Sequence, residues 1–197
     1  IYEILKSVRT DESGHGLAVR QLTIKSLILP CSGGPFLNRK NLENITPKEA
    51  INHPKWKMGP KISLESATLI NKGLEVLEAH YLFNIPLGKI HVKIHPQCKI
   101  HGAVELETPG KKATQVIAYL AKPDMREHIE NALLRAINKT PPKREIRPLE
   151  PNEFTLTDPP KHLPGIPIVL NARNHRKFLQ KEEEVLKKFL DNKISFP

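Results

Sequence analysis

The chain has 197 residues, of which 31 are Lys or Arg and 21 are Asp or Glu, so its formal net charge is +10. A hydrophobic content of 39% supports a packed core and excludes an intrinsically disordered chain. No apolar run approaches the roughly 18 residues of a membrane-spanning helix, and we expect no membrane partner. The positive charge favours an anionic partner. Because the charge is spread along the chain and only 5% of residues are aromatic, we expect a small anionic molecule and no nucleic acid.

The first residues, Ile1-Tyr2-Glu3-Ile4-Leu5, form a helical pattern that is entered in its middle and has no initiator Met. We therefore expect a fragment of a longer protein, and no signal or transit peptide is visible. The two cysteines, Cys31 and Cys98, have neither CxxC nor metal-ligand spacing. This usage predicts a reducing, cytosol-like compartment and no disulfide framework.

In chain order, residues 1–8 have the pattern of a helix end and residues 9–16 that of a polar loop. The apolar, β-branched stretch at 22–29 predicts a buried strand. The motif CSGGPF follows, and backbone N–H groups in such a glycine turn can bind phosphate oxygens. Since GK[ST] and GxGxxG are both absent, this signal alone is weak. The polar, proline-punctuated residues 38–61 predict a long, partly helical loop that serves as an active-site lid.

The next helix is predicted to begin at Ser63 or Glu65 and to end near Phe83. One face carries an apolar stripe, and a second face carries polar groups. The stripe is Ile70, Leu74, Leu77 and Tyr81, and the polar face is Asn71, Glu75 and Glu78 with Thr68 and Lys72 beside them. Two interpretations are open. The face is either a solvated surface with a Lys72–Glu75 ion pair, or a site whose carboxylates bind Mg²⁺ or Mn²⁺.

The second half of the chain predicts strands at 89–95, 99–107 and 113–120 and then a helix at 123–137. Consecutive strands between helices predict an α+β fold with a mixed or antiparallel sheet and flanking helices. We divide the chain into a domain at 1–138, a proline-rich connector at 139–168, and the start of a helical region at 169–197.

Several histidines are candidate metal ligands or anion contacts. His91, His95 and His101 lie on or near predicted strands, but no second element supplies a familiar zinc spacing, which disfavours zinc. His53 lies in the predicted lid near Trp56 and could contact an anion, although a histidine in such a place is more often explained by ordinary packing.

Four segments taken together resemble the 1-deoxy-D-xylulose-5-phosphate reductoisomerase family. They are SGGPF, HPKWKMGPKISLESATLINKGLEVLEAHYLF, HPQCKIH and PDMR, in that order. The resemblance is dense from Leu27 to Arg126 and patchy at 170–174 and 189–196. It implies the central catalytic domain of an enzyme that uses NADPH and Mg²⁺ or Mn²⁺ to rearrange and reduce a phosphorylated sugar in non-mevalonate isoprenoid biosynthesis. It also implies a homodimer in bacterial cytoplasm or in a plastid-type organelle.

The resemblance assigns roles to particular residues. The implied phosphate ligands are Ser32, His53, Ser66, Asn71 and Lys72; the implied metal ligand is Glu75; the implied catalytic residues are Glu75, His53 and Trp56; and the implied neighbours of the nicotinamide are Met58, Gly59 and Met125. The family's N-terminal NADPH domain, its DSEH metal ligands and its C-terminal helical domain are not in this sequence. We therefore expect this chain alone to be inactive.

The sequence also departs from the family pattern. Glu65 replaces an aspartate, and Cys98 and Gly102 replace serines. In the motif that the family has as LNAANE, Arg173 and His175 replace a small residue and a carboxylate. An alternative function is therefore a divergent, non-catalytic relative that keeps a phosphate-binding or dimerisation module.

Overall fold

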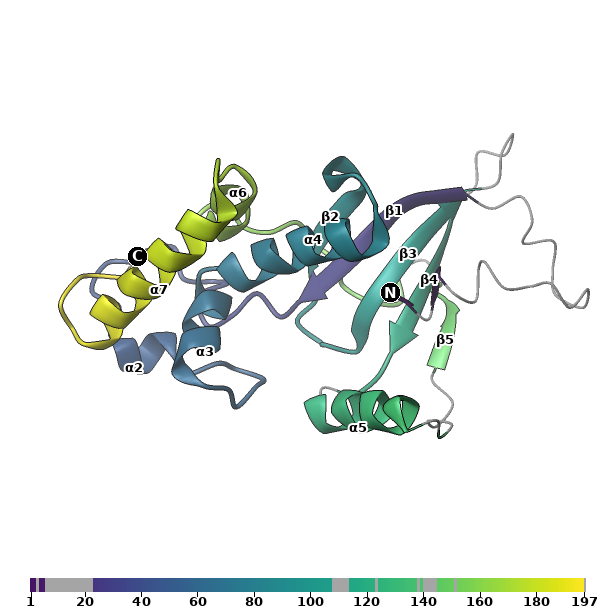
Figure 1. Ribbon diagram of the computed structural model, residues 1–197, viewed down its shortest axis with the longest axis horizontal. Helices are drawn as coiled ribbons and strands as arrows, with labels where there is room; N and C mark the ends of the chain where they lie inside the picture. Colours follow the sequence, from purple (N-terminus) through teal and green to yellow (C-terminus); the bar gives the residue numbers. More distant parts are fainter. Residues whose placement is uncertain are drawn as a thin grey trace, which may run out of the picture.

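The computed structural model describes residues 1–2, 4–5, 23–107, 114–122, 124–137, 139, 145–150 and 152–196. The described residues form a five-stranded sheet in the order β2-β1-β3-β4-β5 (Figure 1). Its strands are β1 (Thr23–Cys31), β2 (Ile90–Ile94), β3 (Ile100–Glu107), β4 (Thr114–Leu120) and β5 (Glu145–Pro148). β1 and β2 are parallel and the other neighbouring strands are antiparallel. The predicted α+β fold with a mixed sheet is confirmed.

Helices gather at one end of the molecule (Figure 1). This helical end contains α2 (Pro47–Ala50), α3 (Pro60–Ala67), α6 (Gly165–Leu170) and α7 (His175–Leu190). The helix α4 (Ile70–Phe83) runs from that end along β1 and β2, and a 3-10 turn at Leu87–Lys89 leads from it into β2. The helix α5 (Met125–Ala136) follows β4. Within the described residues, no helix is both long and apolar enough to span a membrane.

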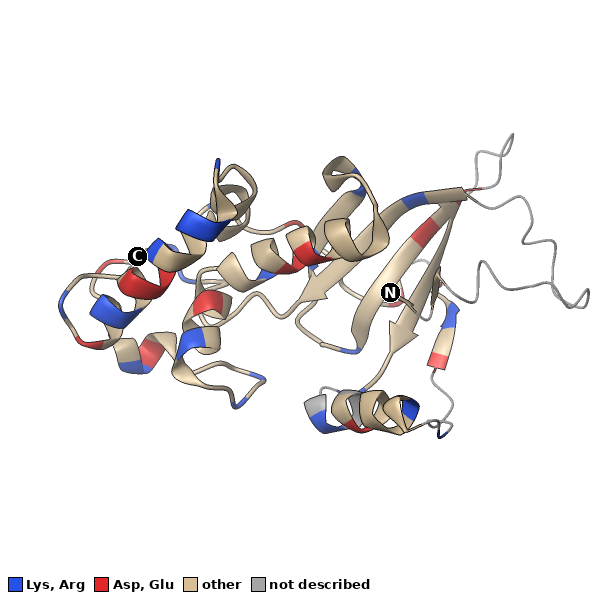
Figure 2. Ribbon diagram, in the orientation of Figure 1, with Lys and Arg blue, Asp and Glu red and all other residues tan. Residues whose placement is uncertain are grey.

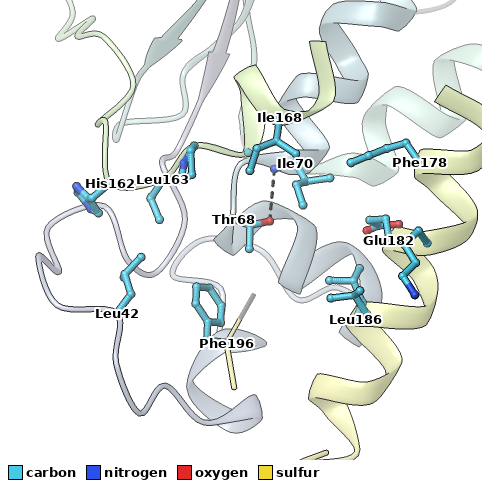
Figure 3. Close-up of a pocket in the computed structure, with 14 residues that line it drawn as sticks. Leu42, Thr68, Ile70, His162, Leu163, Ile168, Phe178, Glu182, Leu186 and Phe196 are labelled. Atoms are coloured by element: carbon cyan, nitrogen blue, oxygen red, sulfur yellow. Dashed lines mark hydrogen bonds between the residues drawn. The ribbon is translucent and has the colours of Figure 1, made fainter. Parts of the chain in front are cut away.

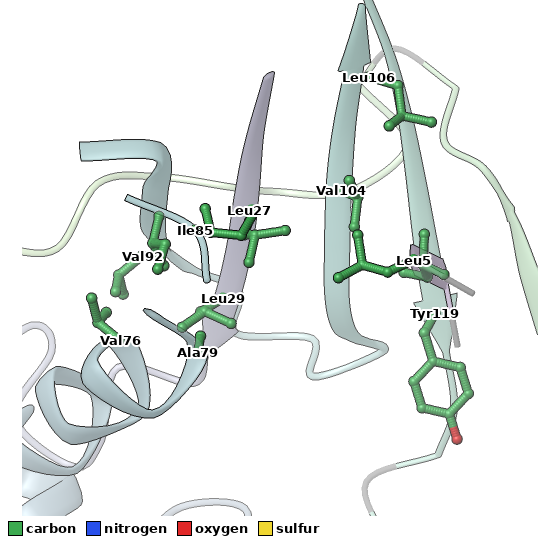
Figure 4. Packing of buried hydrophobic residues seen from close by; sticks show 12 residues of the cluster. Leu5, Leu27, Leu29, Val76, Ala79, Ile85, Val92, Val104, Leu106 and Tyr119 are labelled. Atoms are coloured by element: carbon green, nitrogen blue, oxygen red, sulfur yellow. The ribbon is translucent and has the colours of Figure 1, made fainter. Parts of the chain in front are cut away.

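The sheet buries apolar side chains on both faces because successive side chains of a strand point to opposite sides. Leu27 and Leu29 of β1 pack with Val76 and Ala79 of α4 (Figure 4). Ile28, between them, belongs to a separate cluster on the opposite face. A third cluster holds the helical end together and comprises Phe36, Ile45, Ala50, Leu64, Ala67, Leu69, Leu163, Leu186 and Phe189. The carboxyl end of β1 therefore lies where the sheet meets the helical end.

Charged residues are interspersed over this fold. Figure 2 shows Lys and Arg on the sheet, on α5 and on the helical end, with Asp and Glu among them. The charged residues are thus spread over the sheet and the helices as well as along the sequence.

The structure corrects the helix predicted from Ser63 or Glu65 to Phe83. Two helices replace it, because Leu69 adopts a left-handed backbone conformation with φ of 63° between α3 and α4. The predicted stripe was also wrong at its last position, since Tyr81 is 71% exposed while Val76 and Ala79 are buried.

The described residues of the connector 139–168 contribute β5 and the start of α6. In the segment 1–8, which is predicted to be the end of a helix, Leu5 N–H donates to Ile1 O at 2.9 Å. Residues 3 and 6–8 of this segment lie outside the described residues. The predicted loop at 9–16 also lies outside them.

Candidate functional site

A pocket of about 520 Å³ opens at the carboxyl ends of the two parallel strands. Cys31 at the end of β1 pairs with Ile94 at the end of β2, so the segments that follow both strands meet at one edge of the sheet. These segments are the SGG turn and the turn His95–Cys98, and the amino end of α4 forms a third wall. The lining residues are Pro30, Cys31, Ser32, Gly33, Gly34, His53, Trp56, Met58, Ile62, Ser66, Leu69, Asn71, Lys72, Glu75, His95, Cys98, Ile100 and His101.

The SGG turn packs directly against the end of α3. Gly34 has φ of 70°, a left-handed conformation that side chains disfavour. A Cβ atom there would lie 2.8 Å from the carbonyl oxygen of Ser66. The missing side chain therefore lets the turn approach α3, which places Ser32 and Ser66 in the same pocket.

The break at Leu69 exposes the amino end of α4 to the pocket. Thr68 caps α3 and donates its hydroxyl toward the carbonyl oxygens of Leu64 and Glu65, at 3.2 and 3.1 Å. Gly165 of α6 packs on this junction so closely that a Cβ atom would lie 2.1 Å from Thr68 O. Asn71 and Lys72 then occupy the first turn of α4, where unpaired N–H groups and the helix dipole favour an anion.

Ser32 and His53 form a hydrogen-bonded pair. His53 Nδ1 accepts from the backbone N–H groups of Lys55 and Trp56, at 3.1 and 3.0 Å. Its Nε2 therefore carries the proton and donates to Ser32 Oγ at 3.1 Å. Burial lowers the pKa of His53, which favours this neutral form.

The hydroxyl of Ser32 is left able to donate into the pocket. Its oxygen accepts from His53 Nε2 and from the N–H of Gly34, which lies 3.3 Å away. Among the described contacts, no acceptor takes the hydroxyl proton of Ser32, so this proton is available to an anionic ligand.

Asn71, Lys72 and Glu75 form a connected polar group on α4. Lys72 Nζ donates to Pro30 O at 2.9 Å and to Glu75 Oε2 at 2.6 Å. Asn71 Nδ2 donates to Glu75 Oε1 at 2.8 Å. The side chain of Lys72 is 12% exposed and that of Glu75 is 38% exposed. The ion pair that sequence spacing suggested is present, and it faces the pocket.

His95 has a structural task. It is fully buried, its Nε2 accepts from the N–H groups of Lys99 and Ile100 at 3.0 and 3.1 Å, and its Nδ1 donates to Thr155 O at 3.1 Å. Both ring nitrogens are thus occupied in holding the turn after β2. Among the described residues, no group of three His, Cys, Asp or Glu side chains is placed to bind a metal ion.

The pocket gathers most of the residues singled out from the sequence. Gly59 instead caps the amino end of α3, and Met125 begins α5 with a side chain outside the described ones. Glu78 is exposed and does not line the pocket, and Thr68 lines a different cavity.

Sequence reasoning missed the roles of Pro30 and Cys31. The carbonyl of Pro30 anchors Lys72, and Cys31 lines the pocket as a free thiol whose pKa is raised by burial. Their place immediately before SGGPF was the available signal.

The predicted lid is partly anchored. Within 38–61, Ile45 and Ala50 are buried in the helical end, and a capping box between Thr46 and Glu49 starts α2. Trp56 makes an edge contact with His101, with ring centroids 6.5 Å apart. The stretch at 52–59 contributes no residue to the core clusters, and its movement stays a prediction.

The positions that depart from the family pattern lie in different surroundings. Cys98 lines the pocket, while a Cβ atom on Gly102 would contact Ile1 at 3.1 Å. Glu65 is buried and pairs with Lys61. His175 is the first residue of α7.

Comparison with known proteins now identifies the family. The family model for the 1-deoxy-D-xylulose 5-phosphate reductoisomerase C-terminal domain matches residues 11–83. Reductoisomerases of this name from Thermus thermophilus and Lachnoclostridium phytofermentans are 39% and 40% identical over 192 and 188 residues, which is 92% and 88% of this chain. The chain belongs to the 1-deoxy-D-xylulose 5-phosphate reductoisomerase family.

Solved reductoisomerase structures have the same fold. One in complex with NADPH, fosmidomycin and magnesium is 33% identical with a TM-score of 0.67, and it matches 88% of this chain and 43% of its own. The enzyme from Zymomonas mobilis in complex with NADPH is 30% identical with a TM-score of 0.66. The chain spans about half the length of the reductoisomerases that it matches along most of its own length.

Proposed function

We propose that this chain is the substrate-binding and catalytic part of a reductoisomerase that converts 1-deoxy-D-xylulose 5-phosphate to 2-C-methyl-D-erythritol 4-phosphate with NADPH. The observation that carries the proposal is the convergence of two hydroxyls, an imidazole, an amide and an ammonium at the amino end of α4. The family membership and the NADPH, fosmidomycin and magnesium bound in a related structure support it.

In this proposal the phosphate of the substrate binds against the first turn of α4. Ser32 donates its hydroxyl proton, Lys72 supplies positive charge, and Asn71 and Ser66 donate further hydrogen bonds. His53, held neutral, orients the Ser32 hydroxyl so that its proton points away from the imidazole. Hydrogen bonds to a charged group contribute roughly 1.5–3 kcal/mol each, so a few of them select a phosphate dianion.

Glu75 is our proposed ligand for Mg²⁺ or Mn²⁺, and among the described residues it is the carboxylate that lines the pocket. A bound divalent ion would polarise substrate oxygens as a Lewis acid. The described residues do not assemble a complete metal centre by themselves. Without it, Glu75 accepts hydrogen bonds from Asn71 and Lys72 and holds both at the pocket wall.

We also propose that Met58, Gly59 and Met125 lie near the nicotinamide of NADPH in the assembled enzyme, and that Trp56 covers bound substrate. The division into a catalytic domain at 1–138, a connector at 139–168 and the start of a helical region at 169–197 belongs to the same proposal. A homodimer in a reducing compartment, either bacterial cytoplasm or a plastid-type organelle, completes it. Its support is the family membership and the free thiols of Cys31 and Cys98.

The test is calorimetric binding of fosmidomycin to wild-type protein and to Lys72→Ala in the presence of Mn²⁺. We expect Lys72→Ala to weaken binding at least about tenfold, because a charge-assisted hydrogen bond contributes roughly 1.5–3 kcal/mol. Lys89→Ala removes the same charge from an exposed position outside the pocket and should leave affinity unchanged. Equal affinity of the wild type and Lys72→Ala would refute the assignment.

A further inference from the structure

A carboxyl group interrupts the apolar face of α7. The residues of this helix that face the rest of the helical end follow the spacing of an amphipathic helix, and they are Phe178, Glu182, Val185, Leu186 and Phe189. Glu182 is 6% exposed and lies between Phe178 and Leu186 (Figure 3). An ionised carboxylate is costly at such a position, because the protein does not replace the hydrogen bonds that water would make.

A second buried carboxyl group belongs to α3, the helix against which α7 packs. Glu65 is 5% exposed, and its carboxyl group interacts directly with that of Glu182. A proton on either group makes a hydrogen bond between them, so the proton belongs to the pair. Two ionised carboxylates would instead repel each other across the contact between the helices.

A single ammonium serves both carboxyl groups. Lys61 of α3 hydrogen-bonds to Glu65 Oε1 and lies 3.6 Å from Glu182 Oε2. The side chain of Lys61 is 54% exposed, so water screens its charge. With one shared proton the three groups together are neutral. When the pair loses this proton, one net negative charge is left in a buried contact.

The remaining charged or titratable groups near Glu182 do not offset that charge. Lys181, on the same helix, pairs with Glu184 at 3.0 Å. His162, in the segment before α6, donates through Nε2 to Phe36 O at 3.1 Å. Among the described residues, no N–H group hydrogen-bonds to either carboxyl oxygen of Glu182. The ionisation of Glu182 is therefore controlled by the two residues of α3.

We propose that Glu182 and Glu65 form a pH-sensitive switch that holds α7 against α3 while the two carboxyl groups share a proton and loosens α7 when that proton is lost. Burial and the neighbouring Glu65 raise the pKa of Glu182 from its ordinary value of 4.5 to about 7. Because the folded-state pKa is the higher one, the stabilisation of the contact is fully present below pH 4.5 and is lost as the pH rises through 7.

The switch also has a route to the proposed phosphate pocket. Leu186 and Phe189 of α7 belong to the same core cluster as Phe36 and Leu64. Phe36 ends the SGGPF motif, and Leu64 lies on α3 close to Ser66. Loosening α7 therefore removes support from both walls of the pocket, and we expect it to weaken phosphate binding. This consequence rests on the proposed function, whereas the switch itself does not.

Amide hydrogen exchange measures the opening of α7. If opening returns Glu182 to an ordinary pKa, the protection factors of the α7 amides should fall about tenfold between pH 6 and pH 8, after correction for the intrinsic pH dependence of exchange. The amides of α4 should change much less. Glu182→Gln has no proton to lose and should show no fall, whereas Glu183→Gln, exposed on the same helix, should behave as the wild type.

Glu65→Gln distinguishes a shared proton from burial alone. In this variant Lys61 is left to Glu182, which also loses its negatively charged neighbour, so the fall in protection between pH 6 and pH 8 should be less than about threefold. An undiminished fall in Glu65→Gln, an equal fall in α4 and α7, or no fall in the wild type would overturn the switch.

Fosmidomycin binding in the presence of Mn²⁺ tests the effect on the pocket. The ratio of its affinities for the wild type and Glu182→Gln cancels the titration of the ligand itself. This ratio should decrease severalfold between pH 6 and pH 8, and a constant ratio would overturn the effect on the pocket. If neither protein binds fosmidomycin at either pH, the proposed function is refuted, while hydrogen exchange still decides the switch.

Discussion

Replacing Gly34 or Gly33 with Ala tests whether the SGG turn is built to contact α3. Both residues have positive φ, 70° and 88°, so an alanine at either position costs about 1–2 kcal/mol in backbone strain. The surroundings then distinguish them. A Cβ atom on Gly33 meets the end of the Leu37 side chain at 2.8 Å, whereas a Cβ atom on Gly34 meets the backbone oxygen of Ser66 at 2.8 Å.

The Leu37 side chain can rotate away, but the backbone at Ser66 cannot move without shifting the end of α3. We add the roughly 1–3 kcal/mol typical of overpacking to the strain at Gly34 only. Gly33→Ala should therefore lower the free energy of unfolding by about 1–2 kcal/mol, and Gly34→Ala by about 2–5 kcal/mol.

Urea denaturation at constant m-value measures both losses. The binding of fosmidomycin provides an independent measurement, because Gly34→Ala should also separate Ser32 from Ser66 and weaken binding more than Gly33→Ala does. Equal destabilisation by the two alanines, or a larger effect at Gly33, would show that contact with α3 does not determine the shape of this turn.

Three further predictions follow from other contacts. Burial and the neighbouring Glu65 raise the folded-state pKa of Glu182 from its ordinary value of 4.5 to about 7, so the stability of the wild type should fall as the pH rises from 4.5 through 7. In urea denaturation, Glu182→Gln should remove this dependence on pH and be more stable than the wild type by about 1–3 kcal/mol at pH 8. Glu183→Gln, at an exposed position, should keep the pH dependence of the wild type. The emission of Trp56, the only tryptophan, should shift when fosmidomycin and Mn²⁺ are added, and less so in His53→Ala; an unchanged spectrum at saturation would show that residues 52–59 do not move. Gly165→Ala should destabilise the protein by at least about 2 kcal/mol in thermal unfolding, because its Cβ would lie 2.1 Å from Thr68 O, and a loss below 1 kcal/mol would contradict that packing.

The sheet was predictable because its strands carry a strong local signal. Alternating or continuous apolar residues at 22–29, 89–95 and 99–107 indicated strands, and the structure has strands within one or two residues of these bounds. Parallel pairing of β1 with β2 was not predicted, because register depends on contacts between segments far apart in the chain. That pairing places the SGG turn beside the turn that follows β2.

The break between α3 and α4 at Leu69 could not be predicted from the sequence for a related reason. The periodicity of residues 63–83 continues across it, and neither Gly nor Pro marks the junction. The residue that packs on the break is Gly165, almost a hundred residues away in the sequence. Its missing side chain lets α6 approach Thr68. A break stabilised by such a distant contact leaves no local signal.

The pocket depends on that break. If residues 63–83 formed one helix, the N–H groups at Asn71 and Lys72 would be bonded within the helix and could not face an anion. Local sequence therefore predicts the side chains that would contact a phosphate, whereas the backbone groups that would bind it depend on α6. Substitutions in α6 should consequently weaken binding of a phosphonate without changing any residue of the pocket itself.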